Sequence, residues 1–394
     1  MIELPVQAHL EAIYKALLDT PSHILLVTAE TAAGKSTGIP PYLLKQFSGS
    51  ILMLEPRRVA ALAIASRIAH TLGEQAGNTV GWRLRFDTNV SPSTRLEVMT
   101  EAILTRTIQR DPLLSGVSLV ILDEFHERSI HGDLALALLR EVLSVRQDLY
   151  VLIMSASIDP LPLCTALSAG HYHVPGKTWP VEIRYQESKR LPEGGVESLP
   201  HQVLRAVKTA REGPPGDILV FLPGLAEIRS CEAILAPLKA DIRILHGSLP
   251  FETQKTVLEQ HCGDDRIILS SAIAETSLTI PRVRVVIDSG LARRSRFESK
   301  TSLESLETLP ESDFSALQRA GRAGREAPGL CIRLWGKGDP RLSHDTPEIL
   351  RSELSSLVLE CAQWGCTNRN ALSWLDEPPV MAWDAAVQLL QSLE

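Results

Sequence analysis

The stretch LVTAETAAGKSTGIPP, Leu26–Pro41, decides how the first part of the chain is expected to fold. It continues a short apolar run and leads into a helical pattern, which is the strand–loop–helix context of a phosphate-binding loop. The usual pattern is G-x-x-x-x-G-K-[ST], in which backbone amides and the start of the helix wrap a polyphosphate. Gly34, Lys35 and Ser36 fit it, whereas Ala29 replaces the first glycine. Taken alone, the stretch also fits a helix start with an exposed lysine.

Further short apolar runs follow this loop, and helical patterns separate several of them. Buried strands that alternate with helices predict a parallel sheet covered by helices on both faces. The alternation restarts after 171–186, so the sequence predicts two α/β domains that join near 176–180. Strands are expected at 23–28, 50–55, 95–100, 118–124 and 150–157, and then at 217–224, 242–247, 266–272 and 283–290.

The last part of the chain, from about Gly336, shows helical patterns without another buried strand. One helix is expected over 346–365, because a proline stands in its first turn and a glycine at its end. A second helix is expected over 381–393. The sequence therefore predicts domains at 1–176 and 177–337, followed by a partial helical segment at 338–394.

The composition is that of an ordinary globular protein with more than one core, because 394 residues exceed what a single core supports. The net charge of −7 does not suit a protein that coats nucleic acid by bulk electrostatics, so a polynucleotide would need a local groove. No apolar run is long enough for a membrane span, and the first residues do not resemble a secretory leader. The six scattered cysteines are expected as free thiols in a reducing cytoplasm.

A pair of acidic residues follows another apolar run in LVILDEFHERS, Leu119–Ser129. The run would deliver Asp123 and Glu124 to the carboxyl end of a strand, where open α/β sheets bind ligands. Asp123 suits a Mg²⁺ shell, and Glu124 suits the orientation or deprotonation of an attacking water. The simpler interpretation is an acidic cap in which His126 is merely solvated. The preceding phosphate loop favours nucleotide chemistry.

Three arginines recur at every third position of QRAGRAGR, Gln318–Arg325. On a helix, Arg319, Arg322 and Arg325 would fan along one side. Arginine makes bidentate contacts to phosphate, and arginine fingers stabilise the charge of a transferring phosphoryl group. The alternative is a basic nucleic-acid patch without a catalytic role. The acidic surroundings of this run favour phosphates held by the first domain as its partner.

These stretches, in this order, resemble the DEAH-box helicases of helicase superfamily two, and more narrowly their bacterial HrpB-type subgroup. The matching stretches also include LEPRRVAA at 54–61, TEAILTRTIQRDP at 100–112, FLPGLAEI at 221–228, IAETSLTI at 273–280 and LECAQWGC at 359–366. The resemblance implies two tandem RecA-like domains with parallel sheets, followed by the start of a helical, winged-helix-type segment. It also implies an ATP-dependent RNA helicase, an NTP hydrolase that couples hydrolysis to movement along single-stranded RNA.

The resemblance further implies ATP, with relaxed choice among nucleoside triphosphates, and Mg²⁺ between the two RecA-like domains. The implied catalytic residues are Lys35, Asp123, Glu124, His126, Gln318, Arg322 and Arg325. In that set Gln318 would help to place the water, and His126, together with Ser155–Ser157, would couple hydrolysis to domain movement. The implied nucleotide-binding residues are Ala29, Glu30, Thr31, Ala32, Ala33, Gly34, Lys35, Ser36, Thr37 and Arg67, the last packing on the base. The implied magnesium ligands are Ser36, Asp123 and Glu124.

The partner implied by the resemblance is single-stranded or partly duplex RNA, gripped through phosphate and sugar. The implied RNA-binding residues are Arg57, Arg58, Thr100, Glu101, Ser271 and Thr276. The segment Ala292–Leu309 fits the family's strand-separating hairpin and equally a simple surface hairpin. A cytoplasmic monomer without membrane contact is expected, and no segment identifies a protein partner.

The chain departs from the family pattern at several positions. Ala32 replaces a glycine, and a Cβ there costs about 1 kcal/mol if the backbone needs a positive φ. Ser157 replaces a threonine, while Ser271 and Ala272 replace a threonine and an asparagine. Members of the family also continue well beyond the length of this chain. These departures leave open a nucleotide-gated RNA-binding module with weakened or lost motor activity, and a purely structural scaffold.

Overall fold

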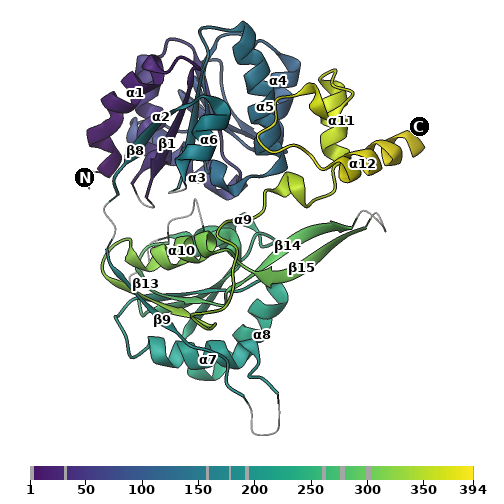
Figure 1. Cartoon of the computed structure of the whole chain (residues 1–394). Coiled ribbons are helices and arrows are strands. Elements are labelled where there is room, and N and C mark those ends of the chain that lie inside the picture. Colours follow the sequence, from purple (N-terminus) through teal and green to yellow (C-terminus); the bar gives the residue numbers. More distant parts are fainter. Residues whose placement is uncertain are drawn as a thin grey trace. The chain divides into compact units, whose positions relative to one another are not determined.

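The computed structural model describes residues 4–30, 33–156, 159–176, 179–190, 195–259, 263–275, 280–298 and 303–393. The chain forms two compact units, each with its own sheet (Figure 1). The first unit comprises Met1–Lys177, Arg296–Ser305 and Thr346–Glu394, and the second comprises Thr178–Ser295 and Leu306–Asp345. The boundaries predicted from the sequence, at 1–176, 177–337 and 338–394, stay a proposal.

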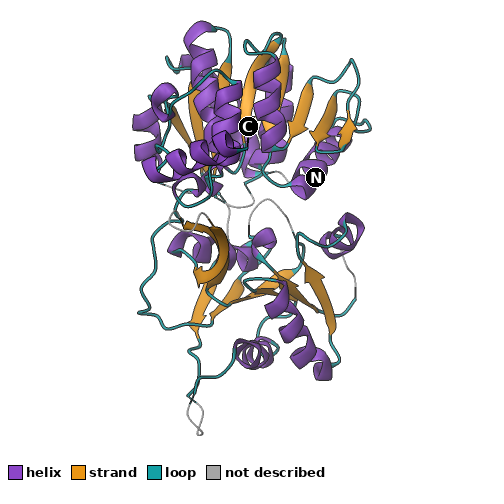
Figure 2. Ribbon diagram, turned by 90° about the vertical axis from the view of Figure 1, so that its right-hand side faces the viewer, coloured by secondary structure: helices purple, strands orange, loops and turns teal. Residues whose placement is uncertain are grey.

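An eight-stranded sheet forms the centre of the first unit, with the strand order β4-β3-β5-β2-β6-β7-β1-β8. All its neighbouring strands run parallel except β3 and β4, which pair antiparallel. Every residue of β1 is buried, because helices cover both faces of the sheet (Figure 2). The strands are β1 Ile24–Ala29, β2 Ser50–Leu54, β3 Val80–Leu84, β4 Asp87–Asn89, β5 Leu96–Met99, β6 Val117–Leu122, β7 Tyr150–Ser155 and β8 Gly170–Val174.

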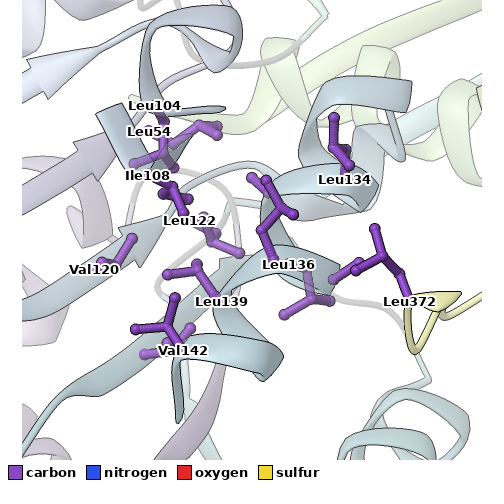
Figure 3. Packing of buried hydrophobic residues seen from close by; sticks show 14 of the residues in the cluster. Leu54, Leu104, Ile108, Val120, Leu122, Leu134, Leu136, Leu139, Val142 and Leu372 are labelled. Atoms are coloured by element: carbon purple, nitrogen blue, oxygen red, sulfur yellow. The ribbon is translucent and has the colours of Figure 1, made fainter. Parts of the chain in front are cut away.

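The C-terminal residues complete the core beside the first sheet. Trp383 and Leu372 share one buried cluster with residues of α4 and α5, and Leu372 lies near Leu136 of α5 (Figure 3). The helices of this unit are η1 Pro5–His9, α1 Leu10–Asp19, α2 Lys35–Gln46, α3 Arg58–Thr71, α4 Glu101–Arg110, η2 Phe125–Glu127, α5 Ile130–Val145, α6 Pro160–Leu167, η6 Glu348–Leu350, α11 Ser355–Gln363, η7 Arg369–Ala371 and α12 Val380–Ser392. Residues far apart in the sequence therefore bury one apolar surface together.

A six-stranded, fully parallel sheet forms the second unit, in the order β11-β12-β10-β13-β16-β9. Its strands are β9 Val181–Tyr185, β10 Asp217–Phe221, β11 Asp241–Leu245, β12 Arg266–Ser270, β13 Val283–Asp288 and β16 Gly329–Arg333. Its helices are α7 Leu199–Ala210, α8 Leu225–Leu235, η3 Ala236–Leu238, α9 Phe251–Leu258, η4 Ala272–Ala274, α10 Asp313–Gly321 and η5 Arg322–Gly324. The strands β14 Leu291–Glu298 and β15 Leu303–Pro310 form a separate two-stranded sheet, and they lie in the segment that was predicted as a hairpin.

The predicted α/β class with parallel sheets is confirmed, and one predicted helix differs in extent. Residues 346–365 form the short η6 and then α11, which begins only at Ser355. The Glu353 carboxylate accepts hydrogen bonds from the Ser355 backbone N–H (2.7 Å) and hydroxyl (2.6 Å), so it satisfies the first backbone N–H of α11. Among the described residues, no helix combines the length and the apolar character that a bilayer crossing requires.

Candidate nucleotide site and the loops around it

Gly34 ends the phosphate loop in a conformation that favours glycine. Its φ is +84°, and it immediately precedes α2. A Cβ built on it would lie 2.7 Å from Leu4 Cδ1, so a larger residue would strain the backbone and displace the Leu4 side chain. Thr31 and Ala32 lie outside the described residues, and the effect of the alanine stays a prediction.

Lys35 lies at the first position of α2 with a buried side chain. Its Nζ donates a hydrogen bond to the carbonyl of Ala29, 3.1 Å away, at the end of β1. Between them, Ala33 N donates to the Glu30 carbonyl (3.3 Å), and the Ala33 carbonyl accepts from Val6 N (3.1 Å). Ser36 and Thr37 follow in the first turn of α2.

Asp123 follows β6, and its carboxylate is buried. Its Oδ1 accepts from the backbone N–H of Glu124 (2.9 Å), while Oδ2 makes no hydrogen bond of normal geometry to any described residue. Burial and the neighbouring Glu124 raise the pKa of Asp123 to about 7, whereas Ser36 and Lys35 act to lower it. The carboxylate therefore lies within reach of the first turn of α2.

These residues fit a magnesium ion bound together with a polyphosphate. Mg²⁺ prefers oxygen ligands, and it is usually held by one or two carboxylates plus phosphates rather than by an all-protein cage. The buried Asp123 Oδ2 and the Ser36 hydroxyl are such oxygens. No group of three or more His, Cys, Asp or Glu side chains suited to a metal occurs in the described ranges.

His126 joins the loop after β6 to the loop after β7. Its Nδ1 lies 3.4 Å from Glu124 Oε2 and accepts a hydrogen bond from the backbone N–H of Ala156 (3.3 Å). Glu124 has φ +49°, a strained value for a residue with a side chain. Ser155 is buried beside Ala156, and Ser157 lies outside the described residues.

The arginines predicted for this unit have different surroundings. The Arg57 guanidinium forms an ion pair with Glu127 (3.0 Å). Arg58 is exposed and donates to the Arg85 carbonyl (3.2 Å) and to an oxygen of Asp87 (3.3 Å). Arg67 is exposed on α3, so its predicted contact with the base stays a prediction.

Thr100 and Glu101 lie where α4 begins. Thr100 precedes the helix without capping it through its side chain. The half-buried Glu101 accepts a hydrogen bond from the Ser129 hydroxyl. Burial, together with the nearby acidic residues, raises the pKa of Glu101 to about 8. Its RNA contact was predicted from the resemblance, whereas the bond to Ser129 was not foreseen.

In the second unit, the residues of QRAGRAGR do not fan along one exposed side. Gln318 and Arg322 are buried, Arg325 is half-buried, and Arg322 Nε donates to the Glu275 carbonyl (3.0 Å). Arg319 is completely buried among three carboxylates. These belong to Glu275 (2.9 Å), Asp288 (2.9 Å) and Glu311.

Two residues predicted to grip RNA, Ser271 and Thr276, follow β12 in the sequence. Ser271 is half-buried, and its backbone N–H donates to the Leu245 carbonyl (3.3 Å). Thr276 lies outside the described residues. The structure thus brings Lys35, Ser36 and Asp123 together in the first unit.

Sequence reasoning missed the partners of the loop after Glu124. Arg128 in that loop binds Asp133 and Asp376, and Glu348 binds the loop backbone. Arg128 stands inside a motif that was singled out, so its involvement could have been suspected. Asp376 and Glu348 lie far from this loop in the sequence, and no local sequence pattern indicated that they contact it.

Comparison with known proteins gives two family matches. Residues 6–162 match the DEAD/DEAH box helicases, and residues 199–327 match the helicase conserved C-terminal domain. A crystal structure of the Escherichia coli DEAH/RHA helicase HrpB superposes with a TM-score of 0.91 at 43% identity, covering 99% of this chain and 50% of that chain. This likeness confirms the predicted pair of tandem RecA-like domains.

Curated relatives give the same result. The chain is 44% identical to the ATP-dependent RNA helicase HrpB of Escherichia coli (strain K12), over 100% of this chain and 49% of the relative. It is 36% identical to the ATP-dependent RNA helicase HrpA of the same organism, over 99% of this chain and 30% of the relative. The chain thus spans half or less of the length of these relatives. The chain therefore carries, in this order, a DEAD/DEAH box helicase domain and a helicase conserved C-terminal domain.

Proposed function

We propose that this chain hydrolyses nucleoside triphosphates, ATP first, and that hydrolysis drives movement along single-stranded RNA. The observation that carries the proposal is the convergence of Asp123 with Ser36 and Lys35 at the carboxyl ends of β6 and β1. Open α/β sheets bind ligands at this edge, and the start of α2 offers backbone amides to phosphate. The named activities of HrpB and HrpA support the same function.

Each residue of this group has a distinct role in the proposal. Lys35 exchanges the Ala29 carbonyl for phosphate oxygens, and the amides around Gly34 bind the same group. Ser36 and Asp123 hold the ion, and Mg²⁺ when bound neutralises developing charge on the phosphates. Glu124, beside Asp123, orients the attacking water and accepts its proton. His126 relays the position of Glu124 to the loop after β7.

The second unit and the RNA contacts keep their predicted roles in the proposal. Gln318 would place the water, and Arg322 and Arg325 would act as arginine fingers. Arg57, Arg58 and the residues at the start of α4 would grip RNA through its backbone. RNA therefore enters as the proposed partner on the strength of the relatives' names and the matched motifs.

We further propose that the chain works as a monomer in the cytoplasm. The proposed catalytic residues all belong to one chain, so no second copy is needed to complete the set. The described cysteines, Cys164, Cys231, Cys331, Cys361 and Cys366, are free thiols, which suits a reducing compartment.

The direct test is steady-state hydrolysis of ATP with Mg²⁺, measured without polymer, with single-stranded RNA and with single-stranded DNA. We expect RNA to stimulate the rate more than DNA. Lys35→Ala should abolish turnover, and Lys45→Ala, an exposed lysine at the other end of α2, should not. Glu124→Gln should stop hydrolysis but retain bound nucleotide. Absence of Mg²⁺-dependent hydrolysis by the wild-type chain under all three conditions would refute the proposal.

A further inference from the structure

The loop that follows Glu124 is held from outside by the C-terminal part of the chain. The backbone N–H of Glu348 donates to the Arg128 carbonyl (3.0 Å). The Glu348 carboxylate in turn accepts from the backbone N–H of Ile130 (3.0 Å), the first residue of α5. One residue therefore fixes the loop on both sides of Ser129. Its carboxylate also lies at the positive end of the α5 helix dipole, where a negative charge is stabilising.

Arg128 forms the second attachment of this loop. Its φ is +47°, a left-handed value that a residue with a Cβ adopts only when its surroundings impose it. Its guanidinium donates to both carboxylate oxygens of Asp133 (2.9 and 3.2 Å) and to the carboxylate of Asp376. Asp133 belongs to α5, whereas Asp376 belongs to the C-terminal segment. The side chain thus ties the loop to both elements.

A single short turn connects Arg128 with Glu124. Glu127 N donates to the Glu124 carbonyl (2.9 Å), and Arg128 N donates to the Phe125 carbonyl (3.1 Å). Phe125 is buried, and the guanidinium carbon of Arg128 lies 5.8 Å from its ring centroid. A displacement of Arg128 must therefore move this turn, and with it the strained backbone of Glu124.

We propose that Glu348 and Asp376 are positioning residues for Glu124, acting through Arg128 and the backbone of the loop. The inference rests on the hydrolytic function proposed above and deepens it. Neither carboxylate needs to touch the nucleotide. Their role is to hold the 124–130 loop in the one conformation in which Glu124 is correctly placed, as outer-shell residues do in other active sites.

The test compares Glu348→Ala, Glu348→Gln and Asp376→Ala in RNA-stimulated ATP hydrolysis. We expect Glu348→Ala and Asp376→Ala to lower kcat by about tenfold, while the KM for ATP changes by less than about twofold. Glu348→Gln should recover most of kcat, because its amide oxygen still accepts from Ile130 N–H. A kcat in Glu348→Ala within twofold of wild type would overturn the inference.

Two matched controls come from the same segment. Glu353→Ala removes the carboxylate that binds Ser355 at the start of α11, and Glu377→Ala removes the partner of Arg369 (2.8 Å). Neither residue binds the loop in the described structure, so both should keep kcat within about twofold. If they lowered kcat as far as Glu348→Ala does, the effect would be one of general stability and the inference would be wrong.

Amide hydrogen exchange separates this inference from the proposed function. In Glu348→Ala, exchange should accelerate at residues 124–130 and remain unchanged in β1. A wild-type chain without hydrolysis would refute the proposed function. Unchanged exchange at 124–130 would instead refute the positioning role, whatever the activity of the wild type.

Discussion

Arg319 shows how one residue can have a role opposite to the one that its spacing suggests. The three-residue repeat predicts a side chain aimed at phosphate, yet its guanidinium is enclosed by Asp288, Glu275 and Glu311 and lies 5.0 Å from the Phe221 ring centroid. Burial and repulsion from Asp288 raise the pKa of Glu311 well above its usual value. The positive charge of Arg319 therefore compensates the negative charge of this buried acidic group and stabilises the second unit.

Arg319→Ala should destabilise the second unit strongly. The substitution leaves the buried carboxylates without their cation, which costs about 3 kcal/mol or more. Urea unfolding followed by circular dichroism measures this loss. Arg293→Ala, which removes a 40%-exposed guanidinium 3.6 Å from Glu227, should cost about 1 kcal/mol or less. A loss in Arg319→Ala no larger than in this control would contradict the structural role.

Glu101 makes the stability of the first unit depend on pH. Its pKa is about 8 in the folded chain, above the ordinary value of 4.5, because of burial and the nearby Glu127, Glu348 and Asp133. The stability that the protonated form contributes is complete below about pH 4.5 and is lost as the pH rises through 8. Glu101→Gln should therefore unfold with a flatter pH dependence than wild type and exceed its stability by several kcal/mol at pH 9, because one pKa unit corresponds to about 1.4 kcal/mol.

The measurement is urea unfolding at several values of pH between 5 and 9. Glu252→Gln, an exposed glutamate on α9, serves as the control and should follow the wild-type curve. Parallel curves for Glu101→Gln and wild type across this range would show that Glu101 is not the titrating group.

At the scale of single elements, Gly34 in the loop before α2 is restricted both by its left-handed backbone and by the neighbouring Leu4 side chain. Gly34→Ala adds both left-handed strain and a contact with Leu4. Since strain alone costs about 1–2 kcal/mol, we expect at least about tenfold weaker binding of ADP, measured with a fluorescent analogue. Gly73→Ala supplies the control, because Gly73 has φ +78° and no atom within 4 Å of an added Cβ. That variant should lose some stability and no affinity.

Most strands with long apolar runs were predicted from the sequence, whereas several shorter strands were not. The apolar runs that end in Ala29, Leu122 and Ser155 lie in strands covered on both faces, so their composition marks them. Strands β3, β4, β8, β9 and β16 were missed, as was α7. Strands β3, β4, β8 and β9 are short and mixed in polarity, whereas β16 is as buried as the predicted strands.

The residues of the candidate site were also predictable only in part. Lys35, Ser36 and Asp123 belong to motifs whose spacing encodes their chemistry, and the structure places them together. Contacts such as Glu348 with Ile130 join residues more than two hundred positions apart. Such pairs leave no local pattern, since only the folded core decides which side chains meet.

At the scale of the whole molecule, the first unit is built from separated parts of the chain. Trp383 of α12 is buried in the cluster that α4 and α5 share. Trp383→Ala should therefore destabilise the first unit by about 3–5 kcal/mol in urea unfolding, as cavities of this size do. Met381, 70% exposed on the same helix, supplies the control, and Met381→Ala should be nearly neutral. Equal losses in both variants would argue against a shared core.

The discontinuous first unit has a consequence for synthesis on the ribosome. The apolar side of α5 emerges early, whereas the helices that cover it are translated only after residues 178–345. At about 5–20 residues per second, this interval lasts on the order of ten seconds or more. Throughout it, the nascent chain presents leucines of α5 to solvent, so we expect chaperones to engage the half-made protein there rather than at its second sheet.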